Sequence, residues 1–279
     1  MNIPQIESNM KDKFGFKATI GASTLTHPGD PVKAINEFLK AEIGLSRFEI
    51  TLGKPLVNRE KTIKELKGLN QEEQLEYSAH VPFLYDDIAH PHPGIREVYV
   101  NEARRTIDLA AEIGANRVVV HPGDRFFDSI LPPNETLNPL KVPREEYRRN
   151  SRESLQTLGN YAGSQGITLL IENLARGLCD LRKEMRETLA STPNSEFLLD
   201  IGHANVSGTT EELLNLEPNF FHFHDNSGDK DSHSELGRGT IKMGKLMKRL
   251  AQYSGEKTII FELYGLKELM NSLEKLQSI

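Results

Sequence analysis

The sequence predicts a (β/α)8 barrel (TIM barrel) of class α/β, in which eight parallel strands are each followed by a helix. Eight short apolar runs alternate with stretches that carry apolar residues at helical spacing. No change of composition marks a linker, so we expect a single domain over 1–279. The rival fold, a doubly wound open sheet, normally carries a glycine-rich phosphate loop after an early strand, and the sequence has none.

The elements follow one another along the whole chain. Residues 1–14 are polar and are expected to be a loose lead-in. The predicted strands cover 16–21, 47–51, 75–80, 117–121, 167–172, 197–200, 220–224 and 258–262. Helices are predicted from Asp30-Pro31 onward, where an N-cap residue precedes proline, and then over 58–67, 94–113, 144–161, 181–190, 209–215, 240–252 and 266–276. Residues 124–143 are a proline-rich loop insertion after the fourth strand, whose role the sequence leaves open.

Composition excludes several classes of protein. The formal net charge of −6 argues against a generally basic nucleic-acid binder. No apolar run approaches the ~20 residues that span a bilayer, the first residues lack the form of a signal peptide, and no protein partner is evident. The lone Cys179 excludes an intrachain disulfide and is interpreted as a structural residue in a reducing environment. A cytoplasmic protein without membrane contact is expected.

Imidazoles and carboxylates stand at or just beyond the ends of the predicted strands. They are Glu49, His80, His121, Glu172, Asp200, His203, His222, Asp231, His233 and Glu262. The carboxyl ends of barrel strands converge on one mouth, so these groups should face one another. Buried carboxylates are costly unless paired, and no Lys or Arg stands at these strand ends. The sequence therefore predicts a divalent-metal site.

Not every histidine is expected to belong to this site. His222 and His224 are expected to point to opposite sides, with His222 as the ligand and His224 in the helix layer. His90 and His92 are interpreted as loop residues, facing solvent or lining the mouth. His27 lies in the first turn, where contact with a substrate is possible but an incidental position is more common.

A set of short motifs resembles the xylose isomerase-like TIM barrels, the superfamily that includes endonuclease IV and many sugar-phosphate isomerases and epimerases. The motifs are Ala79-His80-Val81-Pro82-Phe83, Val120-His121-Pro122-Gly123, Ile171-Glu172-Asn173, Asp200-Ile201-Gly202-His203-Ala204, His222-Phe223-His224-Asp225, Phe261-Glu262 and the segment from Asp231 to Gly239. The resemblance runs from the first strand to the last, and the order and spacing of the motifs together make it specific.

Resemblance to endonuclease IV implies a three-zinc phosphodiester hydrolase, which is the leading functional expectation. It assigns His80, His121 and Glu172 to the first metal, and Glu172, Asp200, His222 and Glu262 to the second. The third metal would take His203, Asp231 and His233. Zn2+ is the expected ion, up to three per chain, and Mn2+ is the alternative. Damaged DNA would be one possible substrate, with a bridging hydroxide attacking the phosphodiester.

The alternative that the resemblance implies is a sugar or sugar-phosphate isomerase or epimerase. Such an enzyme needs only one metal, held by Glu172, Asp200, His222 and Glu262. Glu172 and Glu262 would be the catalytic residues, which exchange a proton on the two faces of a carbon next to a carbonyl. It has no chemical need for Asp231 and His233, and this favours the hydrolase. A non-catalytic metal- or sugar-binding barrel is a third reading, which an intact ligand ring disfavours.

Two kinds of observation bear on the substrate. The chain departs from endonuclease IV in two motifs. Where that family has Asp-Thr-Cys-His, this chain has Asp200-Ile201-Gly202-His203, and where the family has Pro-Gly-Ser-His, this chain has Pro122-Gly123-Asp124-Arg125. These changes spare the ligands but weaken the case for abasic-DNA recognition. Loop arginines at the mouth are candidates for gripping a substrate phosphate, namely Arg125, Arg176 and Arg238. A basic stripe is interpreted as a solvated helix face with ion pairs rather than a phosphate clamp, and it comprises Arg144, Arg148, Arg149 and Arg152.

Overall fold

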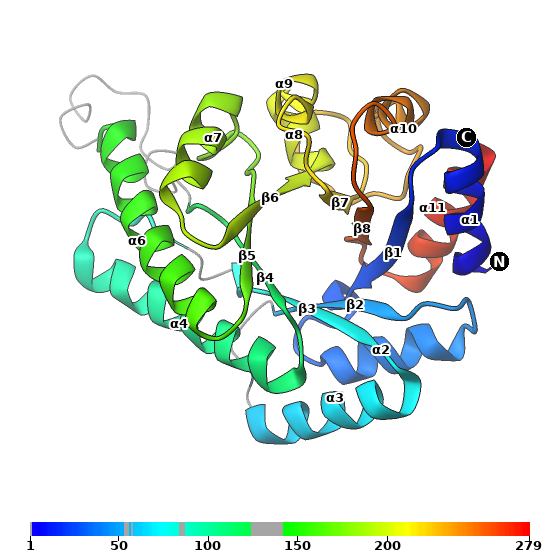
Figure 1. The fold of residues 1–279 in the computed structure, drawn as a ribbon, viewed down its shortest axis with the longest axis horizontal. Helices are drawn as coiled ribbons and strands as arrows, with labels where there is room; N and C mark the ends of the chain where they lie inside the picture. Colours follow the sequence, from blue (N-terminus) through cyan, green and yellow to red (C-terminus); the bar gives the residue numbers. More distant parts are fainter. Residues whose placement is uncertain (1, 53–55, 57, 84–86, 124–141) are drawn as a thin grey trace.

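Eight parallel strands form a closed barrel in the computed structural model, in the order β1-β2-β3-β4-β5-β6-β7-β8 (Figure 1). The structure describes residues 2–52, 56, 58–83, 87–123 and 142–279. The strands are β1 (Ala18–Ser23), β2 (Arg47–Thr51), β3 (Glu76–His80), β4 (Arg117–Val120), β5 (Thr168–Glu172), β6 (Ser195–Asp200), β7 (Phe220–Phe223) and β8 (Lys257–Phe261). The predicted single-domain barrel is confirmed. Most of the predicted insertion, 124–141, lies outside the described residues.

Helices surround the barrel on its outer side (Figure 1). They are α2 (Pro31–Lys40), α3 (Arg59–Glu73), α4 (Pro93–Ile113), α6 (Arg144–Ser164), α7 (Arg182–Ser191), α8 (Ile201–Ser207), α9 (Thr210–Leu214), α10 (Met243–Leu250) and α11 (Leu266–Ser278), with a short 3-10 turn η1 (Thr24–Thr26) after β1. Asp30 caps α2 as predicted, because its side chain accepts a hydrogen bond from the backbone of Lys33. The sequence reading missed α8, which begins directly at the end of β6.

The expectation of a loose lead-in is wrong, because residues Ile3–Phe14 form helix α1. Asn2 caps the helix and Pro4 lies in its first turn. Ile3, Ile6 and Met10 are spaced three and four residues apart, and all three are buried. They pack into the main hydrophobic core, and α1 lies beside α11, so the two ends of the chain are on the same side of the molecule (Figure 1).

The alternation of side chains along the strands places a layer of the hydrophobic core directly beneath the site. Val119, Leu170, Leu198 and Phe220 form one buried cluster across four neighbouring strands. Each lies two residues before a predicted ligand, and side chains two residues apart on a strand point to the same face. The apolar layer therefore supports a layer of imidazoles and carboxylates above it, at the carboxyl ends of the strands.

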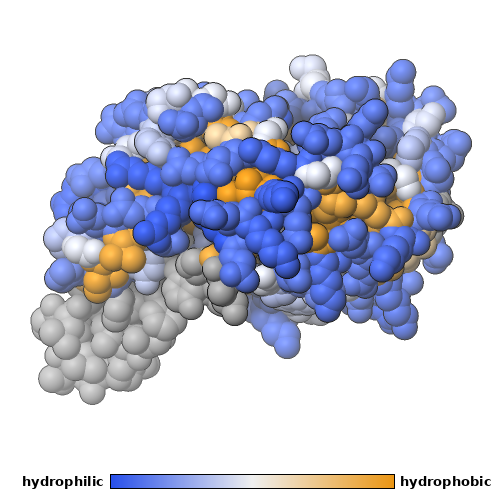
Figure 2. Space-filling view, turned by 90° about the horizontal axis from the view of Figure 1, so that it is seen from below, coloured by the Kyte–Doolittle hydropathy of each residue, from blue (hydrophilic) through white to orange (hydrophobic). Residues whose placement is uncertain are grey.

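The surface is mainly hydrophilic in the view of Figure 2, with hydrophobic residues in separate patches. Ile95, Val98, Leu181 and Tyr264 are the large hydrophobic residues that the described part of the chain exposes. Among the described residues, no helix combines the length and the apolar character that membrane crossing requires.

Candidate metal centre

Glu172 lies at the centre of the predicted site. It ends β5, is fully buried, and its two carboxylate oxygens face different histidines. Its Oε2 lies 3.2 Å from Nε2 of His80 and 3.2 Å from Nε2 of His121. Its Oε1 lies 3.2 Å from Nδ1 of His222 and 3.4 Å from Nδ1 of His203. One carboxylate thus bridges two sets of imidazoles, as a ligand shared by two metal ions would.

A second group consists of Glu172, Asp200, His222 and Glu262, whose ligand atoms lie within 4.8 Å of one another. Asp200 and His222 are paired in the register of β6 and β7, which places their side chains next to each other. His222 Nδ1 faces Glu262 at 3.6 Å, while the opposite ring nitrogen, Nε2, lies 3.0 Å from Glu49. Glu49 is fully buried and belongs to a shell behind the ligands.

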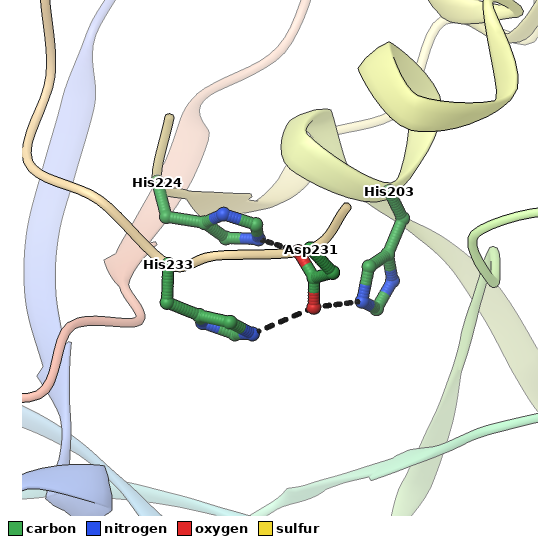
Figure 3. A group of neighbouring side chains, drawn as sticks. All are labelled: His203, His224, Asp231 and His233. Carbon is green, nitrogen blue, oxygen red and sulfur yellow. Dashed lines mark hydrogen bonds and ion pairs between the residues drawn. The ribbon is translucent and has the colours of Figure 1, made fainter. Parts of the chain in front are cut away.

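A third group consists of His203, Asp231, His233 and also His224 (Figure 3). Asp231 Oδ2 lies 3.2 Å from Nε2 of His203 and 2.9 Å from Nε2 of His233. The expectation that His224 lies in the helix layer is wrong. His222 and His224 are two residues apart, so they point to the same face, and Phe223 between them packs into the hydrophobic core.

Several histidines are held in a defined tautomer by backbone carbonyl groups. The Nδ1 of His203 donates to the carbonyl of Asn173 at 2.8 Å, and the Nδ1 of His233 donates to the carbonyl of Glu262 at 3.0 Å. His80 donates in the same way to the carbonyl of the next residue, at 2.7 Å. With Nδ1 protonated, each Nε2 presents a lone pair to the centre, which is the arrangement that metal-binding histidines require.

Two further polar residues, Asn173 and Asp225, position the ligands. Neither was predicted as a site residue from the sequence. The side chain of Asn173 exchanges two hydrogen bonds with the backbone of Asp200, at 2.9 and 3.1 Å. Asp200 in turn caps α8 by accepting from the backbone of His203 at 2.6 Å. Asp225 fastens the loop that carries Asp231 and His233 by accepting from the backbone of Gly237 at 2.9 Å. Asn173 and Asp225 belong to the family-like motifs and lie close to the ligands in the sequence. That position is the one sequence feature that could have indicated their role.

The electrostatics of the centre favour a bound cation. Burial raises the pKa of Glu172, but His222 and His121 outweigh it and hold the pKa well below the ordinary value. Burial lowers the pKa of His222, yet Glu262, Glu49 and Glu172 together raise it well above the ordinary value. Burial also lowers the pKa of His233, but a hydrogen bond to Asp231 outweighs this effect and raises the pKa to about 9. The carboxylates thus demand positive charge.

The donor set fits divalent metal ions. Within the described part of the chain, no Lys or Arg forms an ion pair with the carboxylates of Glu49, Glu172, Asp200, Asp231 or Glu262. Imidazole nitrogens with carboxylate oxygens are the ligands of zinc and of related transition metals. A bound ion would replace the protons that the histidines otherwise have to carry.

Comparison with known proteins decides the family. Residues 39–278 match the family described as the xylose isomerase-like TIM barrel. The chain belongs to this family. The resemblance seen in the motifs is therefore confirmed, and the family match covers β2 to β8.

The solved structures that are similar to this xylose isomerase-like barrel are mainly sugar epimerases and isomerases. A D-tagatose 3-epimerase-like protein is 26% identical with a TM-score of 0.77, over 93% of this chain and 96% of that one. A D-allulose 3-epimerase from Methylomonas sp., in complex with D-allulose, is 21% identical with a TM-score of 0.69, over 92% and 89%. The uncharacterized protein MJ1311 from Methanocaldococcus jannaschii is 26% identical over 96% of this chain and 91% of its own length.

A pocket of about 200 Å³ opens onto the centre of this xylose isomerase-like barrel. Its polar wall comprises His80, His121, His203, Asp231, His233 and Glu262, and its apolar wall comprises Leu25, Phe83 and Tyr264. Glu172, Asp200, His222 and His224 lie beneath this surface and are fully buried. Such a pocket, apolar on one side and polar on the other, suits a small polar molecule.

Of the predicted phosphate-binding arginines, the two that the structure describes, Arg176 and Arg238, do not line this pocket. Arg176 donates to the backbone carbonyls of Val206 and Gly228 at 3.3 and 3.5 Å. Arg238 is exposed and pairs with Glu235 at 2.7 Å. Arg125 lies outside the described residues. Contact of these arginines with a phosphate stays a prediction.

The remaining sequence interpretations concern residues away from the centre. The basic stripe of α6 forms ion pairs, but the two shortest cross to α7 instead of following the helix at i,i+4 spacing, with Arg144 paired to Glu184 and Arg148 paired to Glu187, each at 2.7 Å. His27 pairs with Glu37 at 2.8 Å in its turn, outside the pocket lining. His92 caps α4, and His90 is buried rather than solvent-facing.

Proposed function

We propose that this protein is a divalent-metal-dependent epimerase or isomerase of sugars or sugar phosphates, in which Glu172 and Glu262 transfer the proton. The observation that carries the proposal is the group of Glu172, Asp200, His222 and Glu262, with Glu262 on the pocket surface. Likeness to a D-tagatose 3-epimerase-like protein over nearly the whole chain supports it.

The chain's own residues supply the acid–base chemistry. A divalent ion held by the second group would polarise a substrate carbonyl and make the neighbouring C–H more acidic. One carboxylate removes the proton from one face of that carbon, and the other carboxyl group returns a proton to the opposite face. The configuration inverts without net oxidation or reduction. Glu172 is fully buried beneath the pocket and lies 3.2 Å from His121, in an environment where electrostatic interactions are strong.

The test is proton exchange with the solvent. Protein loaded with Mn2+ or Zn2+ is incubated with a panel of ketoses and ketose phosphates in D2O, and NMR follows epimer formation and deuterium at the carbon next to the carbonyl. We expect both for at least one substrate, and their loss in Glu262→Gln. Glu256→Gln is the control, because Glu256 precedes the same strand at its other end and pairs with Lys17 at 3.0 Å. Absence of exchange across the panel argues against the proposal.

A second candidate, the phosphodiester hydrolase with up to three zinc ions, is favoured by one observation. The residues assigned to three metals by resemblance to endonuclease IV all fall within the groups that can hold a metal ion. Cleavage of abasic-site DNA or of a simple phosphodiester by zinc-loaded protein would support it. The two candidates differ in what they require of Asp231.

A further inference from the structure

The third group offers four ligand atoms, one from each residue, that all lie within 4.8 Å of one another. Ligand atoms about 2.0 Å from a tetrahedral zinc ion lie about 3.3 Å from one another. From Asp231 to the nearest nitrogen of each histidine, the distances are 3.2 Å for His203, 2.9 Å for His233 and 3.6 Å for His224. His203 and His233 face one oxygen of Asp231 and His224 faces the other, so three imidazoles surround one carboxylate closely enough to share a single ion (Figure 3).

His224 reaches this group from below the pocket. It directly follows β7 and is fully buried, whereas His203, Asp231 and His233 line the pocket. Its ring stacks on that of His233 with 4.0 Å between centroids, and its Nε2 points toward the carboxylates. His224 is thus a buried imidazole whose neighbours are carboxylates and other imidazoles. A buried polar group in such surroundings calls for a bonding partner that explains its position.

The backbone makes space for this ring at one specific position. A Cβ at Gly202 would lie 1.9 Å from Cε1 of His224 and 2.5 Å from its Nε2, so any larger residue displaces the imidazole. Gly202 is one of the two positions at which Asp200-Ile201-Gly202-His203 departs from the Asp-Thr-Cys-His pattern of endonuclease IV. The glycine and the additional histidine therefore belong together.

We propose that His224 is a fourth protein ligand of the third site, together with His203, Asp231 and His233, and that this site holds a closed, structural zinc ion. Four protein ligands leave a tetrahedral ion no open position for water or substrate, which is the mark of structural rather than catalytic zinc. The inference does not depend on the proposed function. It accounts for ligands that a one-metal epimerase has no catalytic need for.

A different role for His224 is to hold Asp200 in place. Its Nε2 lies 3.0 and 3.1 Å from the two oxygens of Asp200, which belongs to the second group. The substitution His224→Gln separates the two roles, because a glutamine amide still donates a hydrogen bond to a carboxylate but is a poor zinc ligand. Loss of zinc from the third site with an intact second site is the outcome that the proposal requires.

The experiment compares full-length wild type, His224→Gln, Gly202→Ala and the control Gly68→Ala after loading with zinc and dialysis against a weak chelator. Gly68 lies in α3 with nothing within 4 Å of an added Cβ. Elemental analysis counts the retained ions. We expect His224→Gln and Gly202→Ala to hold one ion fewer than wild type, with its affinity lowered about 100-fold or more, since even outer-shell substitutions cost up to about 100-fold. Gly68→Ala should match wild type.

Two further measurements test whether His224 binds the ion directly. The intense visible absorption of four-coordinate Co2+ should be present in Co2+-loaded wild type and weaken in His224→Gln. An anomalous map at the zinc edge of wild-type crystals should place an ion within bonding distance of His224, and this holds even if the variants do not fold. Unchanged zinc content in His224→Gln, loss of the second-site ion instead, or an ion without His224 would each overturn the proposal.

Discussion

Glu49 Oε1 lies 3.0 Å from His222 Nε2, on the side of the ring opposite the carboxylates of Glu172 and Glu262. The contact is close but off the line of an ideal hydrogen bond. Ser78 donates to the other oxygen of Glu49 at 3.2 Å. A carboxylate behind a metal-binding imidazole fixes its orientation and raises its basicity. Glu49 is therefore a positioning residue for His222.

Glu49→Gln should weaken the second metal site without changing the ligand set. We expect affinity for that ion to fall about 10- to 100-fold, as is typical for outer-shell partners of metal-binding histidines. Competition with a chelating dye measures the affinity. Glu76→Gln is the control, because Glu76 is exposed on the neighbouring strand and pairs with Arg47 away from the pocket. Equal metal affinity in Glu49→Gln and wild type would show that His222 is oriented by other contacts.

Asp231→Ala separates the two candidate functions. Asp231 belongs to the third group and not to the second. A one-metal epimerase should therefore keep its turnover within about tenfold of wild type, or about 1.4 kcal/mol of activation free energy. A three-metal hydrolase should lose its activity. The measurement is turnover at saturating substrate, with retained zinc counted in the same samples. Loss of epimerase turnover with a full second site would contradict a purely structural role for the third.

The sequence predicts the barrel and the ligand ring because both follow from strictly local rules. Apolar runs of strand length define the barrel, and the polar residue at the end of each run, such as Glu172 after Leu169-Leu170-Ile171, defines the ring. The prediction of a loose N-terminus was wrong for a related reason. Only Ile3, Ile6 and Met10 are fully buried on α1, with Phe14 partly buried at its end, and this short apolar stripe is stabilised by packing rather than by propensity.

The role of His224 could not be read from the sequence in the same way. The alternation of side chains along a strand predicts only which face His224 is on. Because β7 ends at Phe223, the position of the His224 ring also depends on the space above Gly202. Glu49 was visible as a polar strand end. Its place behind His222 depends on how β2 and β7 face each other across the barrel, which no local pattern encodes.

Cys179 should be chemically inert in the folded protein. Burial raises the pKa of its thiol to about 12, and Thr188 lies 3.3 Å from the sulfur. At pH 8 only about one thiol in ten thousand would then be ionised, and the thiolate is the reactive form. We expect negligible modification by iodoacetamide in the native state and stoichiometric modification in urea, followed by mass spectrometry. Rapid labelling of the native protein would contradict the structural interpretation of Cys179.

Glu184 links α6 to the start of α7 through Arg144. The Nε and Nη2 of Arg144 donate to the two carboxylate oxygens at 2.9 and 2.7 Å, and Glu184 also accepts from the backbone of Cys179 at 3.2 Å. Glu184→Gln removes the charge but keeps the shape. We expect it to lower the free energy of unfolding at pH 7 by about 2 kcal/mol, the usual range for hydrogen bonds to charged groups. Glu187→Gln is the matched control on the same helix, because its pair with Arg148 is more exposed and should contribute less than about 1 kcal/mol.

The effect of Glu184→Gln should depend on pH with a defined sign. Burial raises the pKa of Glu184, but Arg144 outweighs it and leaves the folded-state pKa below the unfolded value of 4.5. The folded state therefore favours the charged carboxylate, so its contribution is complete above the unfolded pKa and is lost as the pH falls through the folded pKa. Urea unfolding of both proteins at pH 7 and at about pH 3.5 should show the difference between them shrinking at the lower pH. A constant difference would mean that Glu184 stabilises the protein through packing rather than through its charge.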